Sequence, residues 1–217
     1  MAIALDQFQL VYKPVPKAAC SSVKAGLALL DETVAVSMED LAGNNREIHR
    51  IYPTDRFRRR RWMRYRDHFR FTVVRDPIKR LLSVYTNRVV AKNELYHSRK
   101  LRKVQDRLPT HPDPDFFFQN LVAYMDHSSS IKHHALHSHH FTGRDLSLFS
   151  KVYRTSDLAE LGADLSEIVG REVTIPRFNS TDSPLKFEDL APKTRLQLLY
   201  YLAPEYEHLG ALFPRPL

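Results

Sequence analysis

Two segments of the sequence each combine a predicted strand, a short loop and a predicted helix, and this pattern restricts the fold more than any other feature. The first strand covers residues 8–12, and a helix with one apolar face begins near Ser21. The second strand covers residues 69–73, and Asp76-Pro77 then supplies an N-cap and a first-turn proline for the next helix. We therefore expect a three-layer α/β fold, with a central parallel sheet and helices on both of its faces.

The rest of the chain continues the alternation of strands and helices. A third strand is predicted at 148–153, and helices are predicted at 116–125, 157–169 and 192–202. No internal repeat or low-complexity linker divides the sequence, and 217 residues suffice to bury a core. We expect one domain over residues 1–217, with variable insertions at about 31–66 and 92–140.

Charge and cysteine content restrict the partners and the compartment. The chain has 33 Lys and Arg residues against 25 Asp and Glu residues, a formal charge of +8, which favours anionic partners. Its single cysteine excludes an intramolecular disulfide and indicates a reducing compartment, so we expect a cytoplasmic protein. The first 13 residues lack the pattern of a signal peptide, and no stretch reaches the roughly 20 apolar residues of a membrane span. We expect neither a leader nor an anchor.

The loop at residues 14–24 joins the first strand to the first helix, a position where α/β folds hold phosphate groups. Lys17 adds a positive charge to this loop. Its other candidate anion-binding residues are small or carry a hydroxyl or thiol group: Ala18, Ala19, Cys20, Ser21 and Ser22. The two glycines of the nucleotide-triphosphatase P-loop are absent, so for this loop taken alone an ordinary turn with a surface lysine is the better interpretation.

The second strand–loop–helix unit favours the anion-binding interpretation. Arg75 ends the predicted strand, and Ser83 follows eight residues later in the helix. A guanidinium fork and a hydroxyl group can converge on one phosphate. A buried amphipathic helix explains the leucines of this segment but not an Arg-Asp-Pro sequence at the end of a strand.

Together the two segments resemble the carbohydrate branch of the sulfotransferases that use 3′-phosphoadenosine 5′-phosphosulfate (PAPS). Residues 16–22 fit the pattern P-K-x-x-x-[ST]-[ST], and residues 74–85 fit V-R-[DN]-P-x-x-R-x-x-S-x-Y. Residues 151–158 and 178–181 are similar to the same branch, more weakly. The resemblance implies a P-loop-like fold, PAPS as sulfuryl donor, no metal, and a hydroxyl acceptor on a glycan or glycolipid.

The resemblance also implies roles for the candidate residues. The 5′-phosphosulfate would contact Lys17, the amides of 18–22, Ser21 and Ser22, whereas Arg75 and Ser83 would bind the 3′-phosphate. Sulfuryl transfer resembles phosphoryl transfer in placing charge on the leaving oxygen, and we predict that Lys17 stabilises that charge.

A general base for the acceptor hydroxyl is predicted among the histidines of residues 127–140, because histidine titrates near neutral pH. His133 is the first candidate and His134 the second, since His133 matches the leading histidine of an element found in carbohydrate sulfotransferases. Three carboxylates remain open as alternatives: Glu39, Asp40 and Glu47. The i, i+4 spacing of His133 and His137 permits a metal, but no cysteine or His-Glu-x-x-His partner accompanies it.

The basic run Arg58–Arg61 has three interpretations. A solvated helix face ranks first, attraction of an anionic acceptor or donor second, and nucleic acid third, because no nucleic-acid motif accompanies the run. Two other functions stay open for the whole chain: a nucleotide-dependent phosphotransferase, and a non-catalytic protein that binds anions or nucleic acid. The oligomeric state and the acceptor cannot be derived from the sequence.

Overall fold

A computed structural model describes residues 2–43, 45–178 and 185–216, so residues 179–181 of the weaker similarity lie outside the described residues. The chain divides into two compact units. The first comprises Met1–Arg75 and Ser138–Ser180, and the second comprises Asp76–His137 and Thr181–Leu217. One domain over residues 1–217 stays a prediction.

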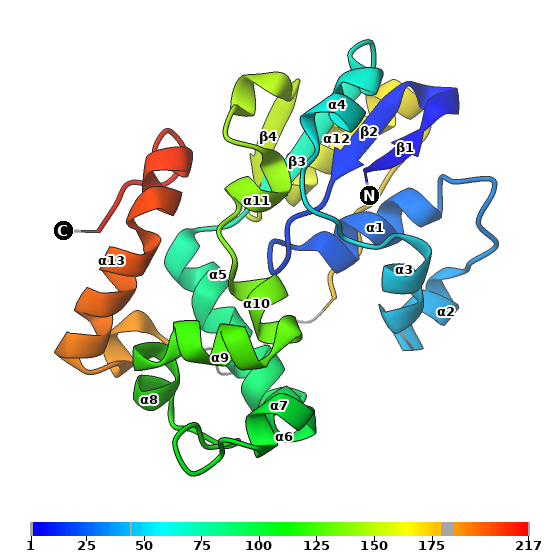
Figure 1. Ribbon diagram of the computed structural model, residues 1–217. Coiled ribbons are helices and arrows are strands. Elements are labelled where there is room, and N and C mark those ends of the chain that lie inside the picture. The colour runs from blue at the N-terminus through cyan, green and yellow to red at the C-terminus, as the bar shows by residue number, and fades with distance from the viewer. Residues whose placement is uncertain (1, 44, 179–184, 217) are drawn as a thin grey trace. The chain divides into compact units, whose positions relative to one another are not determined.

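The first unit is built on a four-stranded sheet in the order β1-β2-β3-β4 (Figure 1). The strands are β1 (Ile3–Leu5), β2 (Leu10–Lys13), β3 (Phe69–Val74) and β4 (Lys151–Arg154). The pairs β2–β3 and β3–β4 are parallel, with Tyr12 opposite Phe71 and Phe71 opposite Lys151. These pairs confirm the predicted α/β class. The edge strand β1 runs antiparallel to β2 and was not predicted, because three residues carry too little periodicity.

Different helices cover the two faces of the sheet (Figure 1). Successive side chains of each strand point to opposite faces. Tyr12, Phe71 and Tyr153 face a buried cluster with helices α1 (Cys20–Ala28) and α12 (Leu158–Val169). Val11, between Leu10 and Tyr12, points to the opposite face and packs with Trp62 of α4 (Arg59–Trp62). The first unit therefore has the predicted three layers.

The remaining helices of the first unit are short. They are α2 (Met38–Gly43), α3 (Asn45–Ile51), α11 (His139–Thr142) and the 3-10 turns η1 (Asp6–Phe8), η2 (Met63–Tyr65) and η4 (Leu146–Leu148). The predicted insertion at 31–66 thus contains α2, α3 and α4.

The second unit is helical and has its own core, formed mainly by α5, α9, α10 and α13. Its elements are α5 (Pro77–Val84), the π-helix η3 (Tyr85–Ala91), α6 (Glu94–His97), α7 (Arg99–Arg102), α8 (Pro114–Gln119), α9 (Leu121–His127), α10 (Ser129–Ala135), η5 (Phe187–Asp189) and α13 (Pro192–Leu209). The apolar stripe predicted after Asp76-Pro77 is buried in this core. Asp76 caps α5 as predicted, its carboxylate accepting a 2.8 Å hydrogen bond from Lys79 N.

Candidate anion-binding site

The loop between β2 and α1 has an unusual backbone. Lys17 and Ala19 have φ values of 64° and 54°, in the left-handed region that glycine usually occupies. Such a conformation costs a non-glycine residue about 1–3 kcal/mol and is concentrated at functional sites. Ala18 between them is not left-handed. The loop thus adopts, without glycines, a backbone conformation of the kind that is concentrated at functional sites.

Helix α1 starts one residue earlier than predicted, and no side chain caps it. Its N-cap is Ala19, so Ser21 and Ser22 lie inside the first turn instead of capping it. The first i→i−4 hydrogen bond joins Val23 N to Ala19 O at 3.1 Å, which leaves the amides of 20–22 ahead of the helical ladder. The amide of Ala18 was also predicted to contact the anion. In the structure it donates instead to Val15 O, at 3.3 Å within the loop.

The structure joins the two predicted motifs at this loop. Arg75, the last residue of the first unit, donates from Nη1 to the carbonyl oxygen of Lys17 at 3.4 Å. β3 delivers Arg75 to this place because it lies parallel to β2, so that both strands present their carboxyl ends at one edge of the sheet. The guanidinium group of Arg75 therefore contacts the backbone of the loop at Lys17, 58 residues earlier in the sequence.

The two serines of the loop have different partners. Ser22 is buried, and its Oγ accepts a 3.2 Å hydrogen bond from Phe178 N. Ser21 Oγ lies 2.8 Å from Nε2 of His49 in α3. The other ring nitrogen of His49 lies 3.1 Å from Nζ of Lys24, which is fully buried and also bonds to Thr54 Oγ1 at 2.7 Å. Sequence reasoning missed this network because His49 is 28 residues from Ser21.

A comparison with protein families identifies the family of this chain. The model of the sulfotransferase family matches residues 2–206, nearly the whole chain. The chain belongs to the sulfotransferase family. Comparisons with curated proteins and with solved structures gave no significant match. The sulfotransferase is therefore a transferase of sulfuryl groups, and the loop around Lys17 is its candidate donor site.

The second predicted phosphate ligand lies in the other unit. Ser83 of α5 donates a 2.6 Å hydrogen bond to the carbonyl oxygen of Arg80, one turn earlier in the same helix. To act as a donor to phosphate, its hydroxyl proton must rotate away from that carbonyl. Its role in the sulfotransferase stays a prediction.

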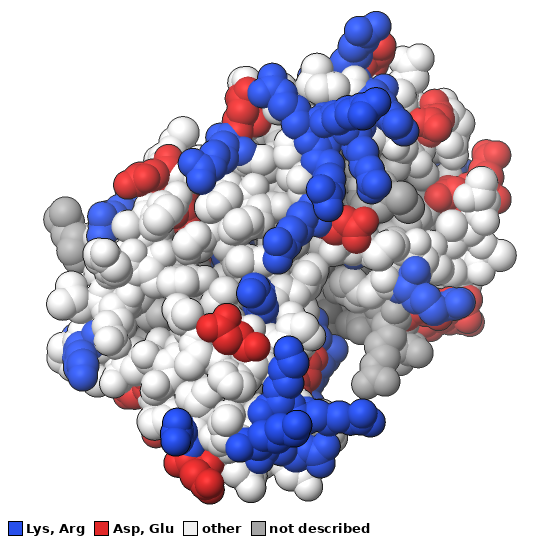
Figure 2. Space-filling view, in the orientation of Figure 1, with Lys and Arg blue, Asp and Glu red and all other residues white. Residues whose placement is uncertain are grey.

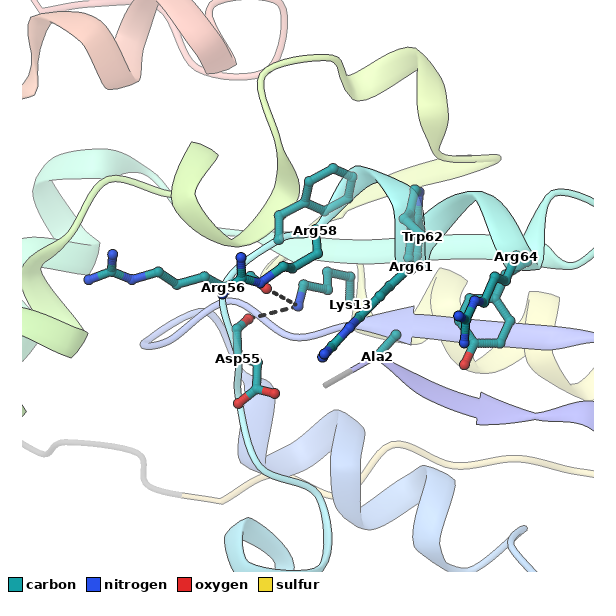
Figure 3. Close-up of a pocket in the computed structure, with 10 residues that line it drawn as sticks. Ala2, Lys13, Asp55, Arg56, Arg58, Arg61, Trp62 and Arg64 are labelled. Carbon is teal, nitrogen blue, oxygen red and sulfur yellow. Dashed lines mark hydrogen bonds between the residues drawn. The ribbon is translucent and has the colours of Figure 1, made fainter.

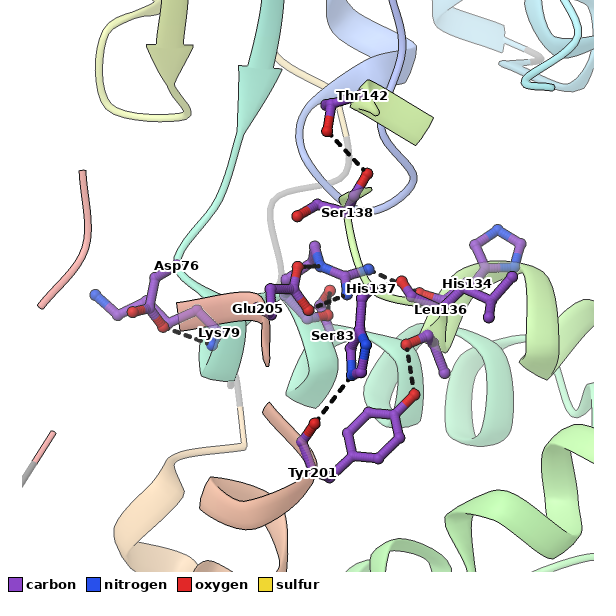
Figure 4. Close-up of polar contacts among 12 residues, drawn as sticks. Asp76, Lys79, Ser83, His134, Leu136, His137, Ser138, Thr142, Tyr201 and Glu205 are labelled. Atoms are coloured by element: carbon purple, nitrogen blue, oxygen red, sulfur yellow. Dashed lines mark hydrogen bonds and ion pairs between the residues drawn. The ribbon is translucent and has the colours of Figure 1, made fainter. Parts of the chain in front are cut away.

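Arg80 of the sequence motif has a structural role in the second unit. It forms a fully buried, two-pronged ion pair with Glu205 of α13, at 2.8 and 3.1 Å. Its guanidinium also donates to the carbonyl oxygens of His134 and Leu136, at 3.1 and 2.9 Å (Figure 4). The end of the candidate base helix α10 is thus fixed through Arg80.

The two candidate base histidines lie next to each other on α10. His134 Nδ1 donates to Ser130 O at 2.8 Å, which makes Nε2 the basic nitrogen of the neutral ring. The ring of His133 packs edge-to-face on it, with centroids 5.0 Å apart. His137 bonds through Nε2 to Tyr201 O at 3.0 Å, and burial lowers its pKa (Figure 4). Of these three histidines, His134 has a hydrogen bond that defines the neutral tautomer in which Nε2 can accept a proton.

The alternative carboxylate bases are already engaged. Hydrogen bonds from Ser37 lower the pKa of Asp40, and a hydrogen bond from Arg50 lowers that of Glu47. A lower pKa makes a carboxylate a weaker base. Both are therefore less suited to the task than an imidazole, and Glu39 is an exposed residue of α2.

The basic run forms one wall of a pocket. Figure 2 shows basic side chains gathered over α4 and the loop before it. A cavity of about 340 Å³ lies there, and Figure 3 shows residues that line it. Its cationic lining residues are Lys13, Arg56, Arg58, Arg61 and Arg64, and its aromatic ones are Phe57, Trp62 and Tyr65.

Lys13 connects this pocket with the donor loop. It ends β2, four residues before Lys17, and its Nζ donates to Asp55 O at 2.7 Å (Figure 3). Burial lowers the pKa of Lys13 to about 8, against the opposing effect of the Asp55 carboxylate. All four residues of Arg58–Arg61 are exposed, as a solvated face requires, and Arg58 and Arg61 also line the pocket, which the sequence does not indicate.

Two further predictions concern metals and membranes. Within the described ranges, no group of three or more His, Cys, Asp or Glu residues is arranged to hold a metal ion. None of the described helices combines the length and the apolar character that a membrane crossing requires. Metal-independent transfer stays a prediction.

Proposed function

We propose that the protein transfers the sulfuryl group of PAPS to a hydroxyl group of a carbohydrate or glycan-bearing acceptor. The observation that carries this proposal is the hydrogen bond from Arg75 to the carbonyl oxygen of Lys17, because it joins the second motif to the loop of the first. A donor with phosphate at two positions of its ribose calls for two phosphate-binding motifs. The family supports sulfuryl transfer, and the donor and the acceptor are the proposed parts.

We propose that the transfer is an in-line displacement. The acceptor oxygen forms a bond to sulfur while the bond between sulfur and the bridging phosphate oxygen breaks. Charge develops on that bridging oxygen, where the Lys17 ammonium group and the amides of 20–22 would stabilise it. The acceptor proton passes to a base, for which His133 and His134 are the proposed candidates.

The pocket beside Lys13 supports an acceptor that carries negative charge. Its arginines can pair with carboxylate or sulfate groups, and the half-buried rings of Phe57 and Tyr65 offer apolar surface to a sugar ring. We propose that this pocket holds the acceptor close to the donor loop.

Calorimetry with adenosine 3′,5′-bisphosphate tests the donor assignment. We expect tight binding of the bisphosphate and weak binding of ATP and of a short oligonucleotide. Arg75→Ala removes one charged fork and should weaken bisphosphate binding about tenfold to a hundredfold. Arg171→Ala, which removes the same charge from an exposed loop position of the first unit, is the control and should bind normally.

Other outcomes of this titration point to the rival functions. Preference for ATP would favour a phosphotransferase, and preference for the oligonucleotide would favour a nucleic-acid-binding protein. Equal bisphosphate affinity of the Arg75→Ala variant and the original protein contradicts the role of Arg75.

The acceptor pocket is tested with the double variant Arg61→Ala/Arg64→Ala. For a negatively charged saccharide, kcat/KM should fall about tenfold at low ionic strength, because two steering charges are lost. The difference should shrink at about 1 M salt, where the Debye length is about 3 Å. Arg99→Ala/Arg102→Ala removes the same charge from α7 and should leave kcat/KM unchanged. If kcat/KM falls equally for neutral and for negatively charged saccharides, the proposed recognition of charge is contradicted.

A further inference from the structure

The network behind the donor loop connects four polar side chains in series. Thr54 contacts Lys24, Lys24 contacts His49, and His49 contacts Ser21, with successive distances of 2.7, 3.1 and 2.8 Å. The series passes through the fully buried side chain of Lys24 and ends at a hydroxyl group in the first turn of α1. The order of donors and acceptors along this series determines what Ser21 can do.

The lysine fixes the tautomer of the histidine. An ammonium group has three donors and no acceptor, so Nδ1 of His49 must accept the hydrogen bond from Lys24. The ring proton of the neutral histidine is then on Nε2, which donates to Ser21 Oγ. With its oxygen accepting from His49, the serine retains its own hydroxyl proton for a further acceptor.

This order of hydrogen-bond donors and acceptors is the reverse of the order in a catalytic triad. There a carboxylate accepts from Nδ1–H, and Nε2 takes the proton of the serine. Here the third group is a donor, so His49 cannot act as a base toward Ser21. The arrangement excludes Ser21 as an activated nucleophile and makes it a hydrogen-bond donor directed by its neighbours.

We propose that Lys24 and His49 are positioning residues that hold the Ser21 hydroxyl as a donor to the 5′-phosphate end of the sulfuryl donor. This proposal rests on the proposed function, because it assigns the anion at the start of α1 to PAPS. A serine oriented in advance loses less entropy when the anion binds than a serine that rotates. His49 thereby connects α3, within the 31–66 segment, to the donor site.

A double-mutant cycle on bisphosphate binding tests whether His49 acts through Ser21. Ser21→Ala and His49→Ala should each weaken adenosine 3′,5′-bisphosphate binding about tenfold. In the Ser21→Ala background, His49→Ala should add almost nothing, because the serine through which it acts is gone. His49→Gln, whose amide can both donate and accept, should restore part of the affinity.

His68→Ala is the matched control, since His68 also bonds to a side chain of the first unit, Asp6, at 3.0 Å. It should bind the bisphosphate normally. Circular dichroism establishes that the variants are folded before affinities are compared. Fully additive losses from Ser21→Ala and His49→Ala would overturn the proposal, as would an unchanged affinity of His49→Ala.

The ring nitrogens of His49 give a second readout that is independent of any ligand. Nitrogen-15 NMR of the whole protein should show Nε2 protonated and Nδ1 unprotonated. A protein that binds no bisphosphate overturns the donor assignment, whatever the tautomer. If the protein binds the bisphosphate while Nδ1 of His49 carries the proton, the positioning role of Lys24 and His49 is wrong, whereas the donor assignment still holds.

Discussion

Replacing Lys17 with alanine should lower kcat about 10²–10³-fold, with only a modest loss of affinity for adenosine 3′,5′-bisphosphate. The bisphosphate is the leaving group and carries the charge of the former bridging oxygen, but the loop amides and Ser21 are proposed to hold the same phosphate without Lys17. Transfer from labelled PAPS measures the first quantity, and calorimetry measures the second. A loss of affinity as large as the loss of turnover would instead make Lys17 a ground-state ligand.

The backbone at Lys17 offers a control for this experiment. Its φ of 64° suits glycine better than any other residue. Lys17→Gly should therefore fold at least as well as the original protein and still be as inactive as Lys17→Ala. Lys17→Arg keeps a positive charge and should retain part of the turnover. Normal turnover in Lys17→Gly would remove Lys17 from the chemistry.

Breaking the buried pair of Arg80 and Glu205 should produce the largest loss of stability. Arg80→Met leaves the Glu205 carboxylate buried without its partner, and such changes cost about 3–5 kcal/mol of unfolding free energy. The carbonyl oxygens of His134 and Leu136 lose donors in the same variant. Urea unfolding followed by circular dichroism measures the effect.

Two further variants separate the buried charge from the packing around it. Arg80→Met/Glu205→Leu removes both charges and should recover much of the lost stability. Arg154→Ala breaks an ion pair in which Arg154 is half exposed, so it should cost no more than about 1 kcal/mol. A loss of similar size for Arg80→Met and Arg154→Ala would contradict the importance of burial.

The sequence predicted the elements whose signals are local. The strand–loop–helix units, the Asp76 cap and the apolar stripe of α5 each depend on residues within a few positions of one another. The family also follows from such short segments, since residues 16–22 and 74–85 carry its patterns. Local patterns do not end elements sharply, which is why α13 extends to Leu209 instead of 202.

Only the tertiary structure decided how these segments act on one another. Glu205 contacts Arg80 at a sequence separation of 125 residues, and His49 contacts Ser21 at a separation of 28 residues. No spacing rule predicts either contact. A buried charge must be paired, but the partner is chosen by which elements pack together. The sequence by itself determined a sulfotransferase with a cationic loop after its first parallel strand. The contacts of Ser21 with His49 and of Arg75 with the Lys17 carbonyl belong to the tertiary structure alone, because each forms only when distant segments meet.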